Sequence, residues 1–294
     1  MEHAAAHGEA GEKPRATLYV VATPIGNLAD ITLRALEVLK KVDAVAAEDT
    51  RVTGRLLAHH GIAKRLIAVH EHNERRAAGQ VLALLGAGQS LAFTCDAGTP
   101  AISDPGALLV GAVRAAGFPV TPVPGPSAAI AALSASGLAD PHFLFYGFLP
   151  ERSGARRRAL APLVALPYAV VFYEAPHRIE DCIADLRAAF GDDRRVVIAR
   201  ELTKLFETIH ECTLAEAPGW LAADAAQRKG EFVLIVEGAE PRVERDPEPV
   251  RRALAVLLAE LPLRQAVDLA AKITGGKRNE IYELALATRK KSGS

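Results

Sequence analysis

Cysteine is scarce in this chain of 294 residues, which contains only three. Cys95, Cys182 and Cys212 are separated by 30 residues or more. This spacing excludes the CxxC pairs and close clusters that bind zinc or form a redox motif. Widely separated cysteines in odd number are typical of free thiols, which persist in a reducing compartment. The sequence therefore predicts a cytoplasmic protein.

The chain also lacks an excess of either charge, because 35 Lys and Arg balance 35 Asp and Glu. No global charge attracts it to nucleic acid or membrane, so any basic surface must be local. No apolar run approaches the ~18 residues of a membrane-spanning helix. The N-terminus lacks the basic segment and following apolar stretch of a signal peptide. We therefore expect no membrane contact.

What is present is an ordinary globular balance of 50% hydrophobic and 24% charged residues. The length of 294 residues is enough for about two domains. Residues 1–16 have no periodicity and are predicted to be a disordered tail. Strand-like and helix-like segments alternate over 17–139, which predicts a parallel sheet covered on both faces. Residues 140–238 read as a second α/β domain with a mixed sheet. A linker over 239–249 and three short helices over 250–294 follow.

Local patterns also set expectations for single elements. Helical periodicity starts at Thr32, and Asp30 is well placed to cap that helix. Another helix, over 127–136, closes the first domain. In the second domain, the sequence pattern predicts a strand over 206–212 and one helix over 215–228.

Three loops rich in Gly and Pro follow strands of the first predicted sheet, at residues 22–27, 95–106 and 124–127. The second has two Asp, two Pro and two Gly in twelve residues, more backbone-shaping residues than a connection needs. Carboxyl ends of parallel strands meet at one sheet edge, where ligands bind. The loops therefore predict a cleft for a small polar ligand that carries an amino acid and a ribose.

Charged residues lie just past several predicted strands. Glu48 and Asp49 follow the second strand, where a dinucleotide site would place its ribose-binding acid, but only Gly26 of a GxGxxG motif is present, which disfavours such a site. Charged residues also follow two strands of the second domain, and such positions often line a site. These residues are Glu174, His177 and Arg178 after one strand, and Arg200, Glu201 and Lys204 after the other.

Two segments are locally basic. Arg156, Arg157 and Arg158 cluster near the start of a helix. Residues 250–294 contain nine Lys or Arg against four Asp or Glu, and their Thr274-Gly275-Gly276 turn resembles that of a helix-turn-helix. A charge run is often only a solvated face, so contact with nucleic acid and a plain surface both stay open at this point.

With these motifs in order, the chain resembles the tetrapyrrole-methylase superfamily, and within it the branch that methylates ribosomal RNA. The match runs from about Leu18 to Gly238, and the helical tail also fits. It is carried by Val21-Ala-Thr-Pro-Ile-Gly-Asn-Leu28, Ala47-Glu-Asp-Thr-Arg51, Glu71-His-Asn-Glu74, Asp96-Ala-Gly-Thr-Pro100, Ser103-Asp-Pro-Gly106, Val123-Pro-Gly-Pro-Ser127, Phe172-Tyr-Glu-Ala-Pro-His-Arg178, Ala199-Arg-Glu-Leu-Thr-Lys204 and Gly230-Glu-Phe-Val-Leu-Ile-Val-Glu-Gly238.

The resemblance implies an α/β fold of two domains, with a parallel and a mixed sheet and a small C-terminal helical module. It implies S-adenosylmethionine as methyl donor in the cleft between the domains, no metal, and a homodimer. The substrate would be a cytidine 2′-hydroxyl in the decoding region of small-subunit ribosomal RNA, within the assembled subunit. The family's donor contacts would fall on Pro24, Ile25, Gly26, Asp96, Ala97, Gly98, Ala101, Ile102, Ser103, Ser127, Ala128, Phe148, Phe172, Tyr173, Ala199 and Phe232.

A ribose hydroxyl is a poor nucleophile, so a nearby side chain should accept its proton. Glu48, Asp49, Glu174, His177 and Glu201 are the candidates, and the sequence does not rank them. RNA phosphates would contact basic residues near the strand ends and in the two basic segments. These are Arg51, Arg178, Arg200, Lys204, Arg156, Arg157, Arg158, Lys277 and Arg278.

Two other functions remain as alternatives. A C-methyltransferase for a tetrapyrrole would need an open, mainly apolar trough and would have little use for a basic tail. An RNA-binding assembly factor would hold the methyl donor without turnover. Methyl transfer to small ribosomal subunits separates the three functions.

Overall fold

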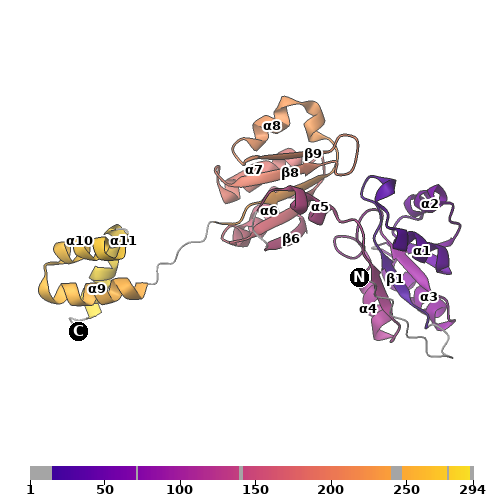
Figure 1. Cartoon of the computed structure of the whole chain (residues 1–294), viewed down its shortest axis with the longest axis horizontal. Helices are drawn as coiled ribbons and strands as arrows, with labels where there is room; N and C mark the ends of the chain where they lie inside the picture. Colours follow the sequence, from indigo (N-terminus) through magenta and orange to yellow (C-terminus); the bar gives the residue numbers. More distant parts are fainter. Residues whose placement is uncertain (1–14, 71, 139–141, 240–246, 277, 292–294) are drawn as a thin grey trace, which may run out of the picture. The chain divides into compact units, whose positions relative to one another are not determined.

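The structure is a computed structural model that describes residues 15–70, 72–138, 142–239, 247–276 and 278–291. These residues divide into two compact units, one before and one after residue 240 (Figure 1). The larger unit contains two five-stranded sheets, and the smaller unit contains three helices. Two residues of the predicted N-terminal tail belong to the larger unit. Arg15 donates a hydrogen bond to the Gly117 carbonyl, and Ala16 is buried.

The first sheet is parallel throughout, as predicted, and its strands stand in the order β3-β2-β4-β1-β5. Every residue of β2 and β4 is buried, because helices cover both faces of a parallel sheet. The strands are β1 Leu18–Val21, β2 Ala44–Ala47, β3 Arg65–Ala68, β4 Leu91–Thr94 and β5 Val120–Val123.

Two pairs of helices cover this sheet. The helices α1 (Leu33–Lys41) and α2 (Thr50–His59) pack on one face, and α3 (Glu74–Gly86) and α4 (Ala107–Ala115) on the other. Side chains alternate along each strand, so that Ala92 of β4 faces the first pair while its neighbours face the second. The two apolar layers fix the strands and therefore the loops at their carboxyl ends.

The second sheet is mixed, in agreement with the sequence pattern, and its order is β6-β7-β10-β8-β9. Only β6 and β7 run parallel to each other, and the other neighbours are antiparallel. The strands are β6 Phe143–Phe148, β7 Ala169–Glu174, β8 Arg195–Arg200, β9 Thr208–Thr213 and β10 Phe232–Val236.

One face of the second sheet is covered by α6 (Ser153–Leu160), α7 (Ile179–Phe190) and α8 (Ala217–Ala223). Its other face is covered by α5 (Ala128–Ala135), whose small Ala129 and Ala132 side chains pack against β7, β8 and β10. The sequence pattern places this helix in the first domain, but its packing joins it to the second sheet. Because five of the eight residues of α5 are alanine and seven of the eight are apolar, its sequence carries no separate apolar stripe that indicates a partner.

Several element ends differ from the predictions for local reasons. Thr32 caps α1, because its hydroxyl accepts the Ala35 N–H, while Asp30 lies in the short 3-10 helix Leu28–Asp30. The predicted helix over 215–228 is two elements, because Asp224 leaves helical conformation and caps a 3-10 turn over Ala225–Arg228. Another 3-10 turn, Ala161–Leu163, extends α6. Residues 206–207 precede β9 and do not belong to it.

The smaller unit consists of α9 (Pro247–Glu260), α10 (Leu263–Thr274) and α11 (Arg278–Lys291). Its core is formed by apolar side chains of all three helices. Residues 247–249, expected in the linker, begin α9, since proline is tolerated in a first helical turn. Gly275 ends α10 in the left-handed conformation at φ 64°. None of the described helices is long and apolar enough to cross a membrane.

Candidate functional site

The three loops predicted to form a cleft follow β4, β1 and β5, which are neighbours in the first sheet. Direct hydrogen bonds join them. Thr23 and Gly98 exchange two backbone hydrogen bonds, with N···O distances of 2.8 and 3.0 Å. The Thr99 hydroxyl donates to the Pro126 carbonyl at 3.1 Å. The loops are therefore one connected surface.

Two glycines permit this close approach. Gly98 has φ 79°, a conformation that other residues rarely adopt, and a Cβ there would lie 3.4 Å from the Ile25 side chain. A Cβ on Gly125 would lie only 2.9 Å from the Cβ of Ala22. The glycines are thus needed where one loop meets another.

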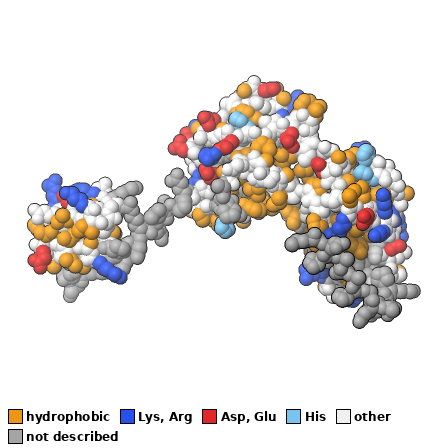
Figure 2. Space-filling view, viewed as in Figure 1, with side chains coloured by type: hydrophobic (Ala, Val, Ile, Leu, Met, Phe, Trp, Pro, Cys, Tyr) orange, Lys and Arg blue, Asp and Glu red, His pale blue; other side chains and the backbone are white. Residues whose placement is uncertain are grey.

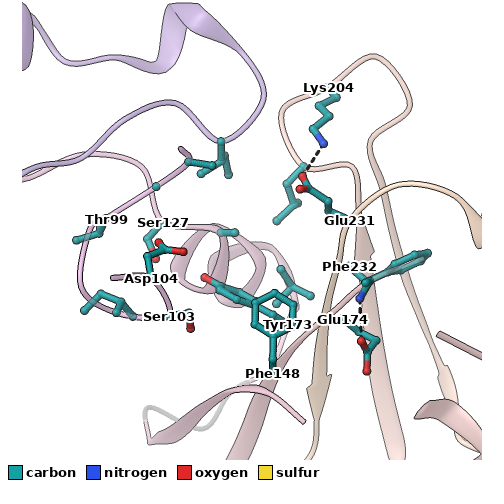
Figure 3. A pocket seen from close by; sticks show the side chains of 18 of the residues that line it. Thr99, Ser103, Asp104, Ser127, Phe148, Tyr173, Glu174, Lys204, Glu231 and Phe232 are labelled. Carbon is teal, nitrogen blue, oxygen red and sulfur yellow. Dashed lines mark hydrogen bonds and ion pairs between the residues drawn. The ribbon is translucent and has the colours of Figure 1, made fainter. Parts of the chain in front are cut away.

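A cavity of about 320 Å³ lies between these loops and the second sheet; we call it the first cavity. That volume is in the range of small-molecule sites. Figure 3 shows Asp104, Ser103 and Ser127 on one side of it, Lys204, Glu231 and Phe232 on the other, and Tyr173 and Phe148 between them. Its remaining lining is Ile25, Ala97, Gly98, Thr99, Ile102, Ala128, Glu174, Ala175, Pro176, Leu202 and Val233.

Ten of the sixteen predicted donor contacts line the first cavity: Ile25, Ala97, Gly98, Ile102, Ser103, Ser127, Ala128, Phe148, Tyr173 and Phe232. Phe172 and Ala199 do not, because both are fully buried within the second sheet. Phe172 points to the opposite face from its neighbour Tyr173, as strand geometry requires. The other four, which also lie outside its lining, are Pro24, Gly26, Asp96 and Ala101.

The rings of Phe148 and Tyr173 belong to the apolar lining of the first cavity. Their centroids are 5.6 Å apart in an edge-to-face arrangement. The Tyr173 hydroxyl oxygen accepts the Ala129 N–H at 3.2 Å, which fixes the ring against the start of α5. Burial raises the pKa of Tyr173, so its hydroxyl stays protonated at neutral pH. These rings suit a flat aromatic ligand.

Carboxylates gather around the loops of the first sheet. Burial raises the pKa of Glu48, Asp96 and Asp104, and each also feels negative charge from other members of the group. A Glu48 oxygen accepts the Asp96 N–H at 3.3 Å, and an Asp96 oxygen accepts the Asp49 N–H at 3.0 Å. Sequence reasoning did not identify Asp104, which lines the first cavity. The one sequence signal for Asp104 is its position in the Gly/Pro loop over 95–106, and that signal does not separate it from the other residues of the loop.

Asp49 differs from these acids. It caps α2 by accepting the Arg51 N–H at 2.8 Å, and it forms an ion pair with the Arg51 side chain at 2.6 Å. Hydrogen bonds from Arg51 lower the pKa of Asp49 to about 2. A carboxylate held so strongly in its ionised form is a weak proton acceptor.

The acids of the second sheet are also paired. Glu174 is buried, lies 3.1 Å from the Arg178 guanidinium and accepts the Ala175 N–H. Lys204 donates to Glu201 at 2.8 Å and to Glu231 at 2.7 Å. Burial acts to raise the pKa of Glu201, but the hydrogen bonds from Lys204 and the Glu231 N–H outweigh it and lower that pKa.

Several cations predicted to contact RNA bond within the protein instead. Arg156 is 2% exposed and forms an ion pair with Asp185 at 2.7 Å. Arg200 is buried and donates to the carbonyls of Lys229 and Phe206. Lys204 lies between two carboxylates, and Arg178 donates to the Leu149 carbonyl. All four side chains thus make contacts inside the fold: Arg156, Arg178 and Lys204 pair with carboxylates, and Arg200 donates to backbone carbonyls.

The other predicted side chains are exposed or lie outside the description. His177, Arg157 and Arg158 are exposed, although Arg157 also pairs with Asp185. The Arg51 side chain is 82% exposed. Arg278 is exposed and pairs with Asp268 at 2.6 Å. Lys277 lies outside the described residues, as does Glu71 of the resemblance motif.

A second cavity of about 280 Å³ lies beside the first, between the loop after β1, the start of the loop after β4 and the helix α2. Pro24 and Asp96, predicted as donor contacts, lie here. Its lining is Thr23, Pro24, Leu28, Val52, Thr53, Arg55, Leu56, Cys95 and Asp96. Within the described parts of the chain, no group of three or more His, Cys, Asp and Glu is placed to hold a metal ion.

Comparison with known proteins gives consistent matches along the chain. The family model of tetrapyrrole (corrin/porphyrin) methylases matches residues 17–218. A model described as the RsmI C-terminal HTH domain matches residues 244–289. The uroporphyrin-III-C-methyltransferase structure from Thermus thermophilus is similar in fold, with a TM-score of 0.54 and 23% identity, over 76% of this chain and 94% of that one.

Curated relatives are much closer in sequence. Ribosomal RNA small subunit methyltransferase I of Escherichia coli O157:H7 is 52% identical over 278 residues, which cover 95% of this chain and 97% of the relative. The protein of the same name from Xylella fastidiosa (strain Temecula1) is 53% identical over 266 residues, covering 90% of this chain and 97% of the relative.

Proposed function

The chain belongs to the tetrapyrrole (corrin/porphyrin) methylase family, and on this premise we propose that it methylates small-subunit ribosomal RNA with S-adenosylmethionine as donor. More specifically, we propose that the methyl group goes to the 2′-hydroxyl of a cytidine ribose in the decoding region. The observation that carries this proposal is the pair of adjoining cavities at one sheet edge, with Glu48, a carboxylate that forms no ion pair with a described residue, beside their shared loop.

The first cavity fits the proposed donor. Its Tyr173 and Phe148 rings would contact the adenine, and the backbone of Ala97, Gly98 and Ser127 would contact polar groups. The donor supplies a methyl group on a positively charged sulfur. Asp104, whose carboxylate has no cationic partner among the described residues, would stabilise that charge. The chain's part in the reaction is to align the groups and exclude water.

Of the five predicted proton acceptors, Glu48 is best suited. Burial raises its pKa, and the negative charges of Asp104, Asp96 and Asp49 add to the rise. A base whose pKa is closer to neutral takes a proton more readily. Asp49, Glu174 and Glu201 form ion pairs with Arg or Lys. Neither Glu48 nor His177 lines a cavity, but Glu48 accepts the Asp96 N–H and so contacts the loop that the two cavities share. We propose Glu48 as the acceptor of the ribose proton.

The smaller unit is proposed to bind RNA. Exposed basic side chains lie on it (Figure 2), and their attraction to phosphates would weaken steeply with salt. In the larger unit, the exposed Arg51, Arg157 and Arg158 remain as phosphate contacts. Deleting residues 240–294 should leave donor binding intact and abolish activity on ribosomal subunits. Unchanged activity after this deletion would contradict the role in RNA binding.

The proposal includes a homodimer in the cytoplasm, carried over from the resemblance. Light scattering coupled to gel filtration should then give twice the chain mass of 31.2 kDa.

The decisive experiment is to incubate the protein with labelled S-adenosylmethionine and small subunits that lack modifications, and then to map the label. We expect one ribose-methylated cytidine in the decoding region. Label on a base or in another region would overturn the position proposed here. Absence of label, with donor binding still measurable, would overturn RNA methylation and favour a tetrapyrrole substrate or an assembly factor.

A further inference from the structure

The second cavity has no part in donor binding as proposed above. It opens at the same sheet edge as the first cavity, and the two share the loop after β4. Cys95 and Asp96 line the second cavity, while Ala97 and Gly98 line the first. The backbone bridge between Thr23 and Gly98 separates them. A ligand in one cavity therefore lies next to a ligand in the other.

The walls of the second cavity are mainly apolar. Leu28 and Val52 are large side chains that remain 40% and 37% exposed, and Pro24 and Leu56 complete the surface. Its two threonine hydroxyls already have partners, since Thr23 donates to the Cys95 carbonyl and Thr53 bonds to Thr94. Apolar walls with few free polar groups suit a flat heterocycle with a small number of hydrogen-bonding atoms.

Two charged groups remain for a ligand. Asp96 uses one oxygen for the Asp49 N–H, which orients the carboxylate, and its other oxygen accepts no hydrogen bond from a residue that the structure describes. An ionised carboxylate only accepts hydrogen bonds, so this oxygen requires a donor. Arg55 pairs with no carboxylate among the described residues, and it lies one helical turn from Arg51. Both arginines are exposed, and guanidinium groups at this spacing suit phosphates that flank a nucleotide.

We propose that the second cavity binds the base of the nucleotide whose ribose is methylated, and that Asp96 accepts a hydrogen bond from the exocyclic amino group of that base. This inference rests on the proposed function and names its base-recognition site. Enzymes that modify a nucleotide commonly take it out of the stack and read its edge in a pocket. Cytosine offers an N4 amino donor to a carboxylate, whereas uracil offers an acceptor, O4, at the same place.

This placement also accounts for the position of Glu48. With the base in the second cavity and the donor in the first, the ribose lies over the shared loop. Glu48 contacts that loop through the Asp96 N–H. Asp96 is thus a specificity residue, and Glu48 a proton acceptor, on one short segment of chain.

Equilibrium binding of fluorescent hexacytidylate and hexauridylate to the full chain tests the site. One good base contact contributes about 1–3 kcal/mol, so wild-type protein should prefer hexacytidylate by roughly 5- to 150-fold. Asp96→Asn keeps the acceptor for the Asp49 N–H but presents an amino group to the base, so the preference should fall to within about twofold or reverse. Asp193→Asn, an equal charge change on an exposed residue before β8, should keep it.

A Val52→Trp variant fills the cavity and tests its location independently. It should weaken binding of both oligonucleotides at least about tenfold while donor affinity stays unchanged, with thermal unfolding as the check on folding. An unchanged cytidine preference in Asp96→Asn, or no preference in wild-type protein, would overturn the site. Neither readout depends on turnover, so a failure of methyl transfer to subunits would overturn the proposed function separately.

Discussion

The carboxylates on the two sides of the first cavity are held in opposite ways. On the side of the first sheet, burial raises the pKa of Glu48, Asp96 and Asp104, and none of the three forms an ion pair with a described Lys or Arg, although the charge of Arg51 acts to lower the pKa of Asp96. On the side of the second sheet, Arg178 pairs with Glu174, and Lys204 pairs with Glu201. Acids with a raised pKa and no cationic partner are candidates for catalysis, whereas loss of one member of a buried ion pair destabilises the fold.

The backbone shows the same division. Loops of the first sheet use glycine where they meet, as at Gly98 and Gly125. The loop after β8 has positive φ at Glu201 and Thr203, 51° and 66°, as the loop after β4 has at Ala101, 65°. It differs in its Lys204, which bridges two carboxylates. We call the side formed by loops of the first sheet the first wall, and the side formed by the second sheet the second wall. Side-chain ion pairs thus fix the second wall, and close backbone packing fixes the first. We therefore expect mutations in the first wall to reduce activity and mutations of the ion pairs around the second sheet to reduce stability.

The largest expected effect is on chemistry in the first wall. Glu48→Gln removes the proposed proton acceptor and should reduce single-turnover methylation of small subunits by about 10²- to 10⁴-fold, with donor affinity little changed. Glu201→Gln, the same change in the paired wall, should stay within about threefold. The division between the walls is broken if the two variants lose equal activity.

The next largest effect is on the free energy of unfolding and comes from the ion pair between α6 and α7, which cover the second sheet. Arg156→Ala leaves Asp185 buried with only the exposed Arg157 and the Ser153 hydroxyl as partners, and breaking such a buried pair costs about 3–5 kcal/mol. Arg158→Ala, an exposed neighbour on α6, should change stability by less than about 0.5 kcal/mol. Urea unfolding of both variants measures this, and equal stabilities would contradict a structural role for Arg156.

Much of the first wall was predictable from sequence, because its signals are local. Gly and Pro loops directly after apolar strands predict both the sheet edge and the cleft, and ten predicted donor positions line the cavity. Asp104 escaped prediction since nothing local separates a lining carboxylate from a loop carboxylate. Its burial, which raises its pKa, arises from contacts formed only in the folded chain.

The second wall was less predictable, because its contacts are tertiary. Arg156 and Arg157 look alike in the sequence, yet one is buried and the other exposed. Only the meeting of α6 with Asp185 of α7 decides between them. Likewise, the sequence of α5, which is apolar on all sides, does not show which sheet the helix covers. Charge runs therefore predict surfaces well only where no partner lies across the fold.

A smaller effect should follow where the walls touch. A Cβ on Gly26 would lie 2.5 Å from Lys204 Cγ and 3.0 Å from the Leu202 carbonyl oxygen, and a backbone atom has little freedom to move. Gly26→Ala should therefore displace one loop and weaken donor binding by roughly tenfold, since small misplacements are costly at such sites. Gly79→Ala, within α3 and open to space, should leave donor affinity unchanged and is the matched control for calorimetry.

The smallest effect concerns the pH dependence of stability. Asp104 has a raised pKa in the fold, so the folded state disfavours its charge, and stability is lost as pH rises through that pKa. Asp104→Asn should therefore be more stable than wild type near pH 7.5, by less than about 1 kcal/mol after solvent screening, and equal to it at pH values below the pKa of an unfolded Asp.

Glu201 has a lowered pKa, so its stabilisation is present above the unfolded Glu value and disappears as pH falls through the folded pKa. Glu201→Gln should accordingly be less stable than wild type near pH 7.5 and match it in acid. Urea unfolding at both pH values measures these differences. Unpaired and paired carboxylates should change the free energy of unfolding with opposite signs, so a change of the same sign in both variants would contradict the distinction between the walls.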